Sequence, residues 1–161
     1  SNSELQYLTT TTDLNDQNAY IFGEIDQVTT SVTMRMDYVV SPEFTIQYYG
    51  SPFISAIDYS DPKVITNPRA DKFSDRFSRD VSFSNQNYET DYDFNFRQFR
   101  SNLVLRWEYR PGSLVFLVWT QGRTGFDGGN GEFNYGSDFN DLFSVKPENV
   151  FLIKFSYLLG Y

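Results

Sequence analysis

The chain has 161 residues, of which 19% are aromatic, and its formal net charge is −8. This length suits one domain, and an acidic chain without a cluster of Lys and Arg is poorly suited to bind nucleic acid. The sequence contains no Cys and no His. Disulfides, thiolate chemistry, imidazole metal sites and Ser-His or Cys-His catalysis are therefore excluded.

The mean hydropathy is −0.46 despite the many aromatic residues. Apolar residues are thus interleaved with polar ones, which is the pattern that strands need. No apolar run approaches the ~18 residues of a spanning helix. If the chain meets lipid, we expect it to do so as a closed sheet, because unpaired backbone groups are too costly in hydrocarbon.

The first half of the chain predicts a series of strands. A Thr-rich strand is expected over residues 4–12, followed by a polar turn at 13–16. Apolar and polar residues then alternate from 20 to 40, with Val and Met on one face and Thr, Ser, Arg and Asp on the other. A turn at 41–43 leads into a strand that begins at Phe44.

The second half contains a clear hairpin and a terminal strand. Strands are predicted over 98–109 and 114–121, joined by the turn Arg-Pro-Gly-Ser at 110–113. From 149 to 161 every second residue is bulky and apolar, and the chain ends on Tyr161. A terminal aromatic on such a strand is typical of outer-membrane barrels, where Tyr161 would act as the insertion signal.

The connections differ in length in a regular way. Short turns at 41–43 and 110–113 fall at one end of the predicted sheet, and long polar links at 51–97 and 122–148 fall at the other. We therefore predict an all-β, antiparallel up-and-down outer-membrane β-barrel over residues 1–161, with short periplasmic turns and long extracellular loops. Six strands are fewer than the eight of a small barrel. Either the 51–97 stretch hides another pair, or this is the C-terminal portion of a larger barrel.

Several strings resemble a known family. They are ELQY at residues 4–7, YIFGEIDQ at 20–27, IQYYGSPF at 46–53, RSNLVLRWEYRPGS at 100–113, LVWTQ at 117–121 and NVFLIKFSY at 149–157. They resemble the C-terminal domain of a Gram-negative outer-membrane family of unknown function, which typically follows a carbohydrate-binding-family-9-like module. The resemblance implies a barrel at the cell surface linked to glycan or nutrient handling, and a longer precursor. It supplies no catalytic residues.

On the barrel hypothesis, the two rows of each strand face different solvents. The lipid-facing candidates are Val32, Met34, Met36, Leu105, Trp107, Tyr109, Phe151, Ile153, Phe155 and Tyr157. The polar candidates for the lumen are Arg35, Asp37, Arg106, Glu108 and Lys154. The polar set forms either a structural ladder of opposite charges or the lining of a selective pore.

Three further patterns have a plainer explanation. Residues 91–95 open like a calcium loop, and 127–132 place carboxylates among glycines, but neither completes the twelve-residue motif, so no metal is predicted. Paired carboxylates in the links, such as Asp58 with Asp61 or Asp138 with Asp141, are too common by chance to indicate a glycosidase, and no enzyme activity or cofactor is predicted. The aromatic residues of the links either stack on sugars or pack over the sheet. They are Tyr59, Phe73, Phe77, Tyr88, Tyr92, Phe126, Phe133 and Tyr135.

The sequence thus predicts a non-catalytic outer-membrane protein in transport or glycan handling. Its expected partners are outer-membrane lipid and the barrel-assembly machinery, with glycans and further chains as additional candidates. The alternative is a soluble β-barrel or sandwich that binds a small apolar or sugar ligand. In that case the side chains predicted to face lipid would converge inward instead.

Overall fold

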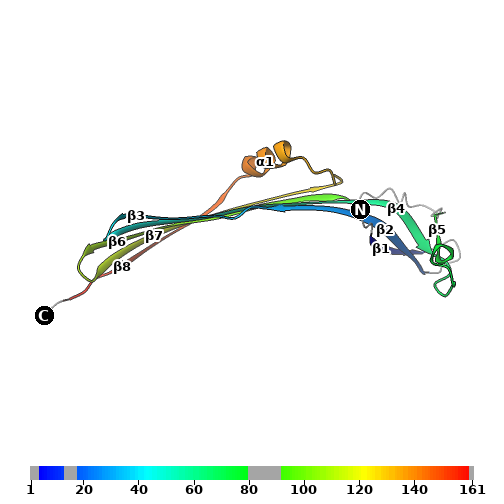
Figure 1. Cartoon of the computed structure of the whole chain (residues 1–161), viewed down its shortest axis with the longest axis horizontal. Helices are drawn as coiled ribbons and strands as arrows, with labels where there is room; N and C mark the ends of the chain where they lie inside the picture. The colour runs from blue at the N-terminus through cyan, green and yellow to red at the C-terminus, as the bar shows by residue number, and fades with distance from the viewer. Residues whose placement is uncertain (1–3, 13–17, 80–91, 160–161) are drawn as a thin grey trace. The chain divides into compact units, whose positions relative to one another are not determined.

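The structure, a computed structural model, describes residues 4–12, 18–79 and 92–159. These ranges contain eight strands and two short helices (Figure 1). The strands are β1 (Glu4–Thr12), β2 (Asn18–Ser31), β3 (Met34–Ser41), β4 (Phe44–Ile65), β5 (Phe77–Ser78), β6 (Phe94–Arg110), β7 (Ser113–Gly128) and β8 (Glu148–Ser156). The helices are the 3-10 helix η1 (Phe73–Arg76) and the α-helix α1 (Tyr135–Ser144). Within the described ranges, no helix is long and apolar enough to cross a membrane.

The strands form one sheet in the order β1-β2-β4-β6-β7-β8, and β3 and β5 also pair with β4. The described pairings of β1 with β2, β3 with β4, β4 with β5 and β7 with β8 are antiparallel. The predicted all-β antiparallel class is therefore confirmed. Among the described residues β1 and β8 stay at opposite ends of the strand order, so the sheet is not closed. The barrel stays a prediction.

Both short turns form where the sequence predicts them. In the β3–β4 turn, Ser41 Oγ accepts a hydrogen bond from Glu43 N at 3.2 Å and donates to Glu43 Oε2 at 2.9 Å. In the β6–β7 turn, Pro111 precedes Gly112, whose φ is 75°. Pro followed by a residue with positive φ is the signature of a type II turn. Glu108 Oε1 also accepts from Gly112 N at 2.8 Å, which fixes the β6–β7 turn to β6.

The two long links contain more regular structure than predicted. β4 continues to Ile65 and β7 to Gly128, so the segments expected as loops begin as strand. The sequence offers residues 53–57 and 80–83 as the extra strand pair of the 51–97 stretch. Residues 53–57 lie inside β4, so they continue a predicted strand, and 80–83 fall outside the described ranges. Pro52 also lies inside β4, where its carbonyl accepts from Val32 N at 3.1 Å.

The predicted continuous strand over 20–40 is also corrected, because β2 ends at Ser31 and β3 begins at Met34. The sequence indicates no helix in the 122–148 link, but α1 occupies part of it. Asn134 caps this helix with a side chain that accepts from the backbone N–H groups of Gly136 and Ser137. Gly, Ser and Asn are typical of loops, which is why the helix was not predicted, but Asn is also a favourable helix N-cap.

The chain folds into two compact units. Unit 1 comprises residues 1–28, 55–95 and 127–133, and unit 2 comprises 29–54, 96–126 and 134–161. In unit 1 a small core forms from Ala19, Ile21 and Val64, with Leu8 packed against it. In unit 2 the buried apolar residues are Ile54, Phe99 and Leu142.

Candidate functional site

The strand register of unit 2 separates an apolar face from a reverse face, which is polar on β3 and β4 and mixed on β7 and β8. Opposite residues on antiparallel strands share a face. Between β3 and β4, Met36 pairs with Tyr48. Between β7 and β8, Leu117 pairs with Ile153 and Trp119 with Phe151. These pairs belong to one apolar row on each strand.

Two contacts on the reverse face show that these rows lie on the same side of the sheet. Arg35 of β3 and Asn102 of β6 line one shallow hollow, so they share a face. Thr120 Oγ1 of β7 donates to Asn102 Oδ1 at 2.6 Å, which places Thr120 on that face as well. The alternate residues of β3, β4, β6, β7 and β8 therefore form the opposite, apolar face. On β6 its members are Leu103, Leu105, Trp107 and Tyr109.

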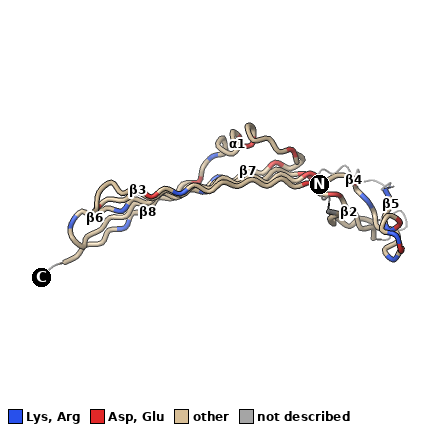
Figure 2. Tube along the Cα trace, viewed as in Figure 1, with Lys and Arg blue, Asp and Glu red and all other residues tan. Residues whose placement is uncertain are grey.

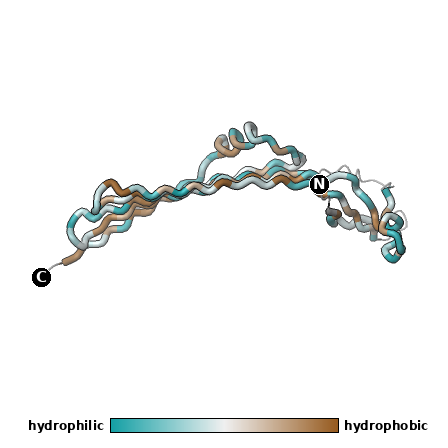
Figure 3. The backbone as a smooth tube through the Cα atoms, viewed as in Figure 1, coloured by the Kyte–Doolittle hydropathy of each residue, from teal (hydrophilic) through white to brown (hydrophobic). Residues whose placement is uncertain are grey.

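The apolar face is open. None of the ten residues predicted to face lipid is buried; eight are exposed, and Leu105 and Tyr109 are half-buried. Phe155 is 73% exposed and Ile153 is 59% exposed. Figure 3 shows hydrophobic stretches along β3 and β8. An exposed apolar surface of this kind is typical of faces that contact another protein, a membrane or an apolar ligand.

Aromatic side chains occupy both ends of the apolar face. At one end Trp119 stacks on Phe151 with ring centroids 5.9 Å apart, and its Nε1 donates to Asn149 Oδ1 at 2.9 Å. At the other end the Arg110 guanidinium lies 5.8 Å from the Tyr157 ring centre and donates to its hydroxyl at 3.3 Å. Between these ends, Leu117 lies opposite Ile153 and Val115 lies opposite Phe155. The Trp and Tyr rings, which carry polar atoms, thus lie at the two borders of this part of the face, as in aromatic girdles.

The polar face carries the residues predicted for the lumen. Arg35 lies over the ring of its cross-strand neighbour Tyr49, 5.6 Å from the centre. Asp37 accepts from Gln47 Nε2 at 2.8 Å, again directly across the strand pair.

The rest of the polar set forms fewer links between strands. Arg106 and Glu108 approach to 3.6 Å within one strand, and Lys154 lies opposite Phe116. The predicted ladder of opposite charges is thus made of local pairs, not of ion pairs between strands.

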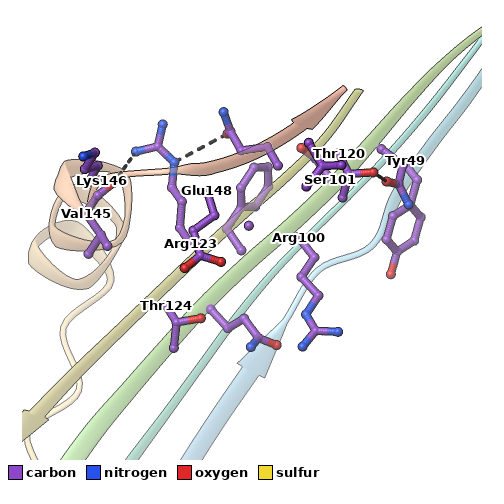
Figure 4. A pocket seen from close by; sticks show the side chains of 15 residues that line it. Tyr49, Arg100, Ser101, Thr120, Arg123, Thr124, Val145, Lys146 and Glu148 are labelled. Atoms are coloured by element: carbon purple, nitrogen blue, oxygen red, sulfur yellow. Dashed lines mark hydrogen bonds between the residues drawn. The ribbon is translucent and has the colours of Figure 1, made fainter. Parts of the chain in front are cut away.

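A cleft of about 640 Å³ opens on unit 2 (Figure 4). Tyr49, Arg100, Thr120, Lys146 and Glu148 are among the residues that line it. Figure 4 shows the hydrogen bond between Thr120 and Asn102 beside Tyr49. Sequence reasoning did not select Arg100, although it shares the alternation of Asn102 and Arg106. That periodicity is the signal that could have found it.

Helix α1 is attached to the sheet by a buried charged contact. Arg97 Nη1 lies 3.4 Å from Asp138 Oδ1, and both side chains are only 5% exposed. Asp141 Oδ2 lies at the same distance from Arg97. Phe99 and Phe143 add a ring contact with centroids 5.1 Å apart. The two carboxylates considered as an acid pair therefore flank a guanidinium instead.

A second arginine, Arg123 of β7, holds the C-terminal end of α1. Arg123 donates to the carbonyls of Phe143 and Val145, the latter at 2.9 Å, and lies over the Phe143 ring. These contacts join the end of α1 to β7.

Comparison with known proteins identifies the family. A sequence model of the domain of unknown function DUF5916 matches residues 1–161. The chain belongs to this family. No curated protein matches it. No solved structure matches it either.

The remaining predicted sites of this DUF5916 domain have local roles or lie outside the described ranges. In the 127–132 segment, Asn130 Oδ1 accepts from Glu132 N at 3.1 Å, and Gly129 N donates to Asp93 O at 2.7 Å. Nowhere in the described part of the chain do three or more Asp or Glu side chains group as metal ligands. Asp91, Tyr88 and the insertion signal Tyr161 lie outside the described residues.

Proposed function

We propose that unit 2 forms part of the wall of an outer-membrane β-barrel, with its apolar face against lipid and its polar face toward the lumen. The observation that carries the proposal is an exposed apolar row along the strands of this unit, whose reverse face carries the polar residues of β3, β4 and β6 and Lys154 of β8. A sheet whose two faces differ in this way suits a barrel wall, in which outward residues contact lipid and inward residues contact water.

The cost of leaving the apolar face in water supports the same proposal. Each buried apolar Å² contributes roughly 25 cal/mol, so uncovered rings along these strands forfeit a large stabilisation. The unpaired edge of β8 also supports the proposal, because β8 pairs only with β7 among the described residues. All nine residues of β8 are exposed, and nine residues match the ~9–11 of a tilted spanning strand. Further strands would complete the wall.

The charge distribution is compatible with this placement. Unit 2 contains eight Lys or Arg and six Asp or Glu, a net charge of +2, whereas unit 1 contains five and fifteen, a net charge of −10. Figure 2 marks the charged residues of the described ranges along the trace. Charges are costly at the lipid-facing surface of a barrel, so the acidic unit 1 belongs in water.

The wider role follows from the resemblance of the chain to surface-exposed Gram-negative proteins. In this proposal the domain is non-catalytic, follows a carbohydrate-binding-family-9-like module and serves transport or glycan handling at the cell surface. The polar cleft of unit 2 would then line the lumen.

A pair of adjacent substitutions tests the proposal. Leu152 and Ile153 are 54% and 59% exposed, but they lie on opposite faces of β8. Arg on the lipid face of a barrel costs about 2–4 kcal/mol near the midplane, whereas a lumen position tolerates it. We expect Ile153→Arg to reduce folding into lipid vesicles strongly and Leu152→Arg to fold nearly as the parent does. Folding is measured by protease protection and by the gel shift of unheated samples.

The soluble alternative predicts a different result. If water surrounds both faces of β8, the two Arg variants behave alike, and both stay folded in buffer. Equal behaviour of the two variants, or folding of the parent chain that is independent of vesicles, would overturn the membrane proposal.

A further inference from the structure

An aromatic shelf lies in unit 1, apart from the face and cleft described above. The ring centres of Tyr7 and Phe22 are 5.8 Å apart, those of Phe22 and Phe77 are 6.1 Å apart, and those of Phe77 and Phe73 are 5.1 Å apart. All three contacts are edge-on. The series begins on β1 and ends on η1, where Phe73 is 63% exposed. An exposed phenyl ring fixed by a row of packed rings offers a rigid surface for stacking.

A charged cluster lies beside this shelf. Lys63 Nζ is 2.6 Å from Glu24 Oε1 and 2.9 Å from Asp61 Oδ2. Arg79 donates to both oxygens of Asp61, from Nε at 3.0 Å and from Nη2 at 2.9 Å. Two carboxylates and two cations give the cluster a net charge of zero.

The cluster stays ionised over a wide pH range. Hydrogen bonds from Arg79 and Lys63 lower the pKa of Asp61 below its ordinary value. Hydrogen bonds to Glu24 and Asp61 raise the pKa of Lys63. Their mutual hydrogen bonds also hold these side chains in fixed positions, so the donors and acceptors that they do not use among themselves are preorganised.

The shelf and the cluster meet at a cavity. It has a volume of about 550 Å³ and is lined by Lys63, Phe73, Ser74, Phe77 and Arg79. A cavity of this size accepts a small organic ligand, and an apolar wall with a few convergent polar groups is the usual composition of such a site.

We infer that this cavity binds an uncharged carbohydrate, with a sugar ring stacked on Phe73 and its hydroxyls hydrogen-bonded to Arg79, Ser74 and Lys63. The two cations that line the cavity, Lys63 and Arg79, are both paired with carboxylates of Glu24 or Asp61, so their charge is already balanced and gives an anion little advantage. A sugar ring presents an apolar C–H face and a rim of hydroxyls, which matches an aromatic wall beside fixed polar groups. This inference goes beyond the proposed membrane role and does not depend on it, because every residue used lies in unit 1.

The test is carbohydrate binding by the full chain in detergent micelles. An array of neutral and anionic oligosaccharides is screened first, and the strongest neutral one is then titrated by calorimetry. We expect a neutral glycan to bind. Phe73→Ala should weaken binding about two- to tenfold, because it removes the ring on which the sugar stacks. Phe73→Trp, which keeps a stacking ring, should bind at least as well as the parent chain.

A matched control separates stacking from general loss of an exposed ring. Phe126 is also 63% exposed, but it lies in unit 2, and Phe126→Ala should bind as the parent chain does. Circular dichroism verifies that each variant keeps its β structure. Absence of any neutral ligand, preference for anionic glycans, unchanged affinity of Phe73→Ala, or equal losses in the Phe73 and Phe126 variants would each refute the inference. A refutation here leaves the vesicle experiment on β8 unaffected.

Discussion

Gly112 is favoured at its position by its backbone conformation. Its φ of 75° lies in the left-handed region, and an added Cβ would also meet the terminal methyl of Leu158, an exposed side chain that can rotate away. Replacing a glycine that needs positive φ strains the backbone by about 1 kcal/mol. The β6–β7 turn therefore depends on this residue.

We predict that Gly112→Ala lowers the free energy of unfolding by at least about 1 kcal/mol. The control is Gly122 on the same hairpin strand, where an added Cβ would meet nothing within 4 Å. Gly122→Ala should be neutral or slightly stabilising. Urea-induced unfolding followed by tryptophan fluorescence measures both variants, and equal destabilisation would show that the turn does not impose the requirement.

At the scale of the elements, α1 is held on the sheet by Arg97. Removing one partner of a buried ion pair leaves the other charged and unpaired, which costs about 3–5 kcal/mol. We predict that Arg97→Leu releases α1, seen as faster hydrogen exchange of the amides of residues 135–144. Arg100→Leu, three residues along β6 at an exposed position, should change stability by less than about 0.5 kcal/mol.

The charged cluster of unit 1 predicts how its stability depends on pH. The pKa of Asp61 is lowered, so its contribution is present above its ordinary value of 3.8 and is lost as pH falls through the lower folded value. The pKa of Lys63 is raised, so its contribution is present below 10.5 and is lost as pH rises through the folded value.

The substitution Asp61→Asn tests the loss of stability at low pH. Asn tolerates the φ of 48° that Asp61 adopts, so the backbone is not disturbed. We expect the thermal unfolding temperature of the parent chain to decrease as the pH drops below about 4. The unfolding temperature of the variant should be lower at neutral pH and should change less over the same pH interval. Identical pH profiles would show that the cluster does not contribute to stability.

At the scale of the whole molecule, the decisive property is the medium that covers the apolar face. We predict that the chain requires detergent or lipid to stay dispersed and folded, because Phe155 and its neighbours would otherwise associate. Ultracentrifugation after extraction with and without detergent measures this. A monodisperse monomer in plain buffer would contradict the barrel-wall proposal.

How far the sequence predicts the fold differs from element to element. β1 matches its predicted bounds, and the turns before Phe44 and Ser113 form as expected, because alternation and turn residues are local signals. The extension of β4 to Ile65 was not predictable in this way. Polar residues in that segment resemble a loop, but partners on β2, β5 and β6 keep it extended.

The candidate sites show the same division. Alternation alone selected Ile153 for one face and Lys154 for the other, and the β7–β8 register agrees with that separation. The contacts of Arg97 with α1 and of Asp61 with Arg79 join residues distant in sequence, so no local pattern could indicate them.

The sequence by itself determined that the chain is all-β and that β3 and β6 each carry one apolar and one polar row, because side-chain direction alternates with every residue along a strand. It left the facing of β7 open, because both rows of that strand are apolar. Only the tertiary structure decided where the strands end, where α1 is attached and which charges meet, because these depend on long-range pairing that a periodic pattern does not encode.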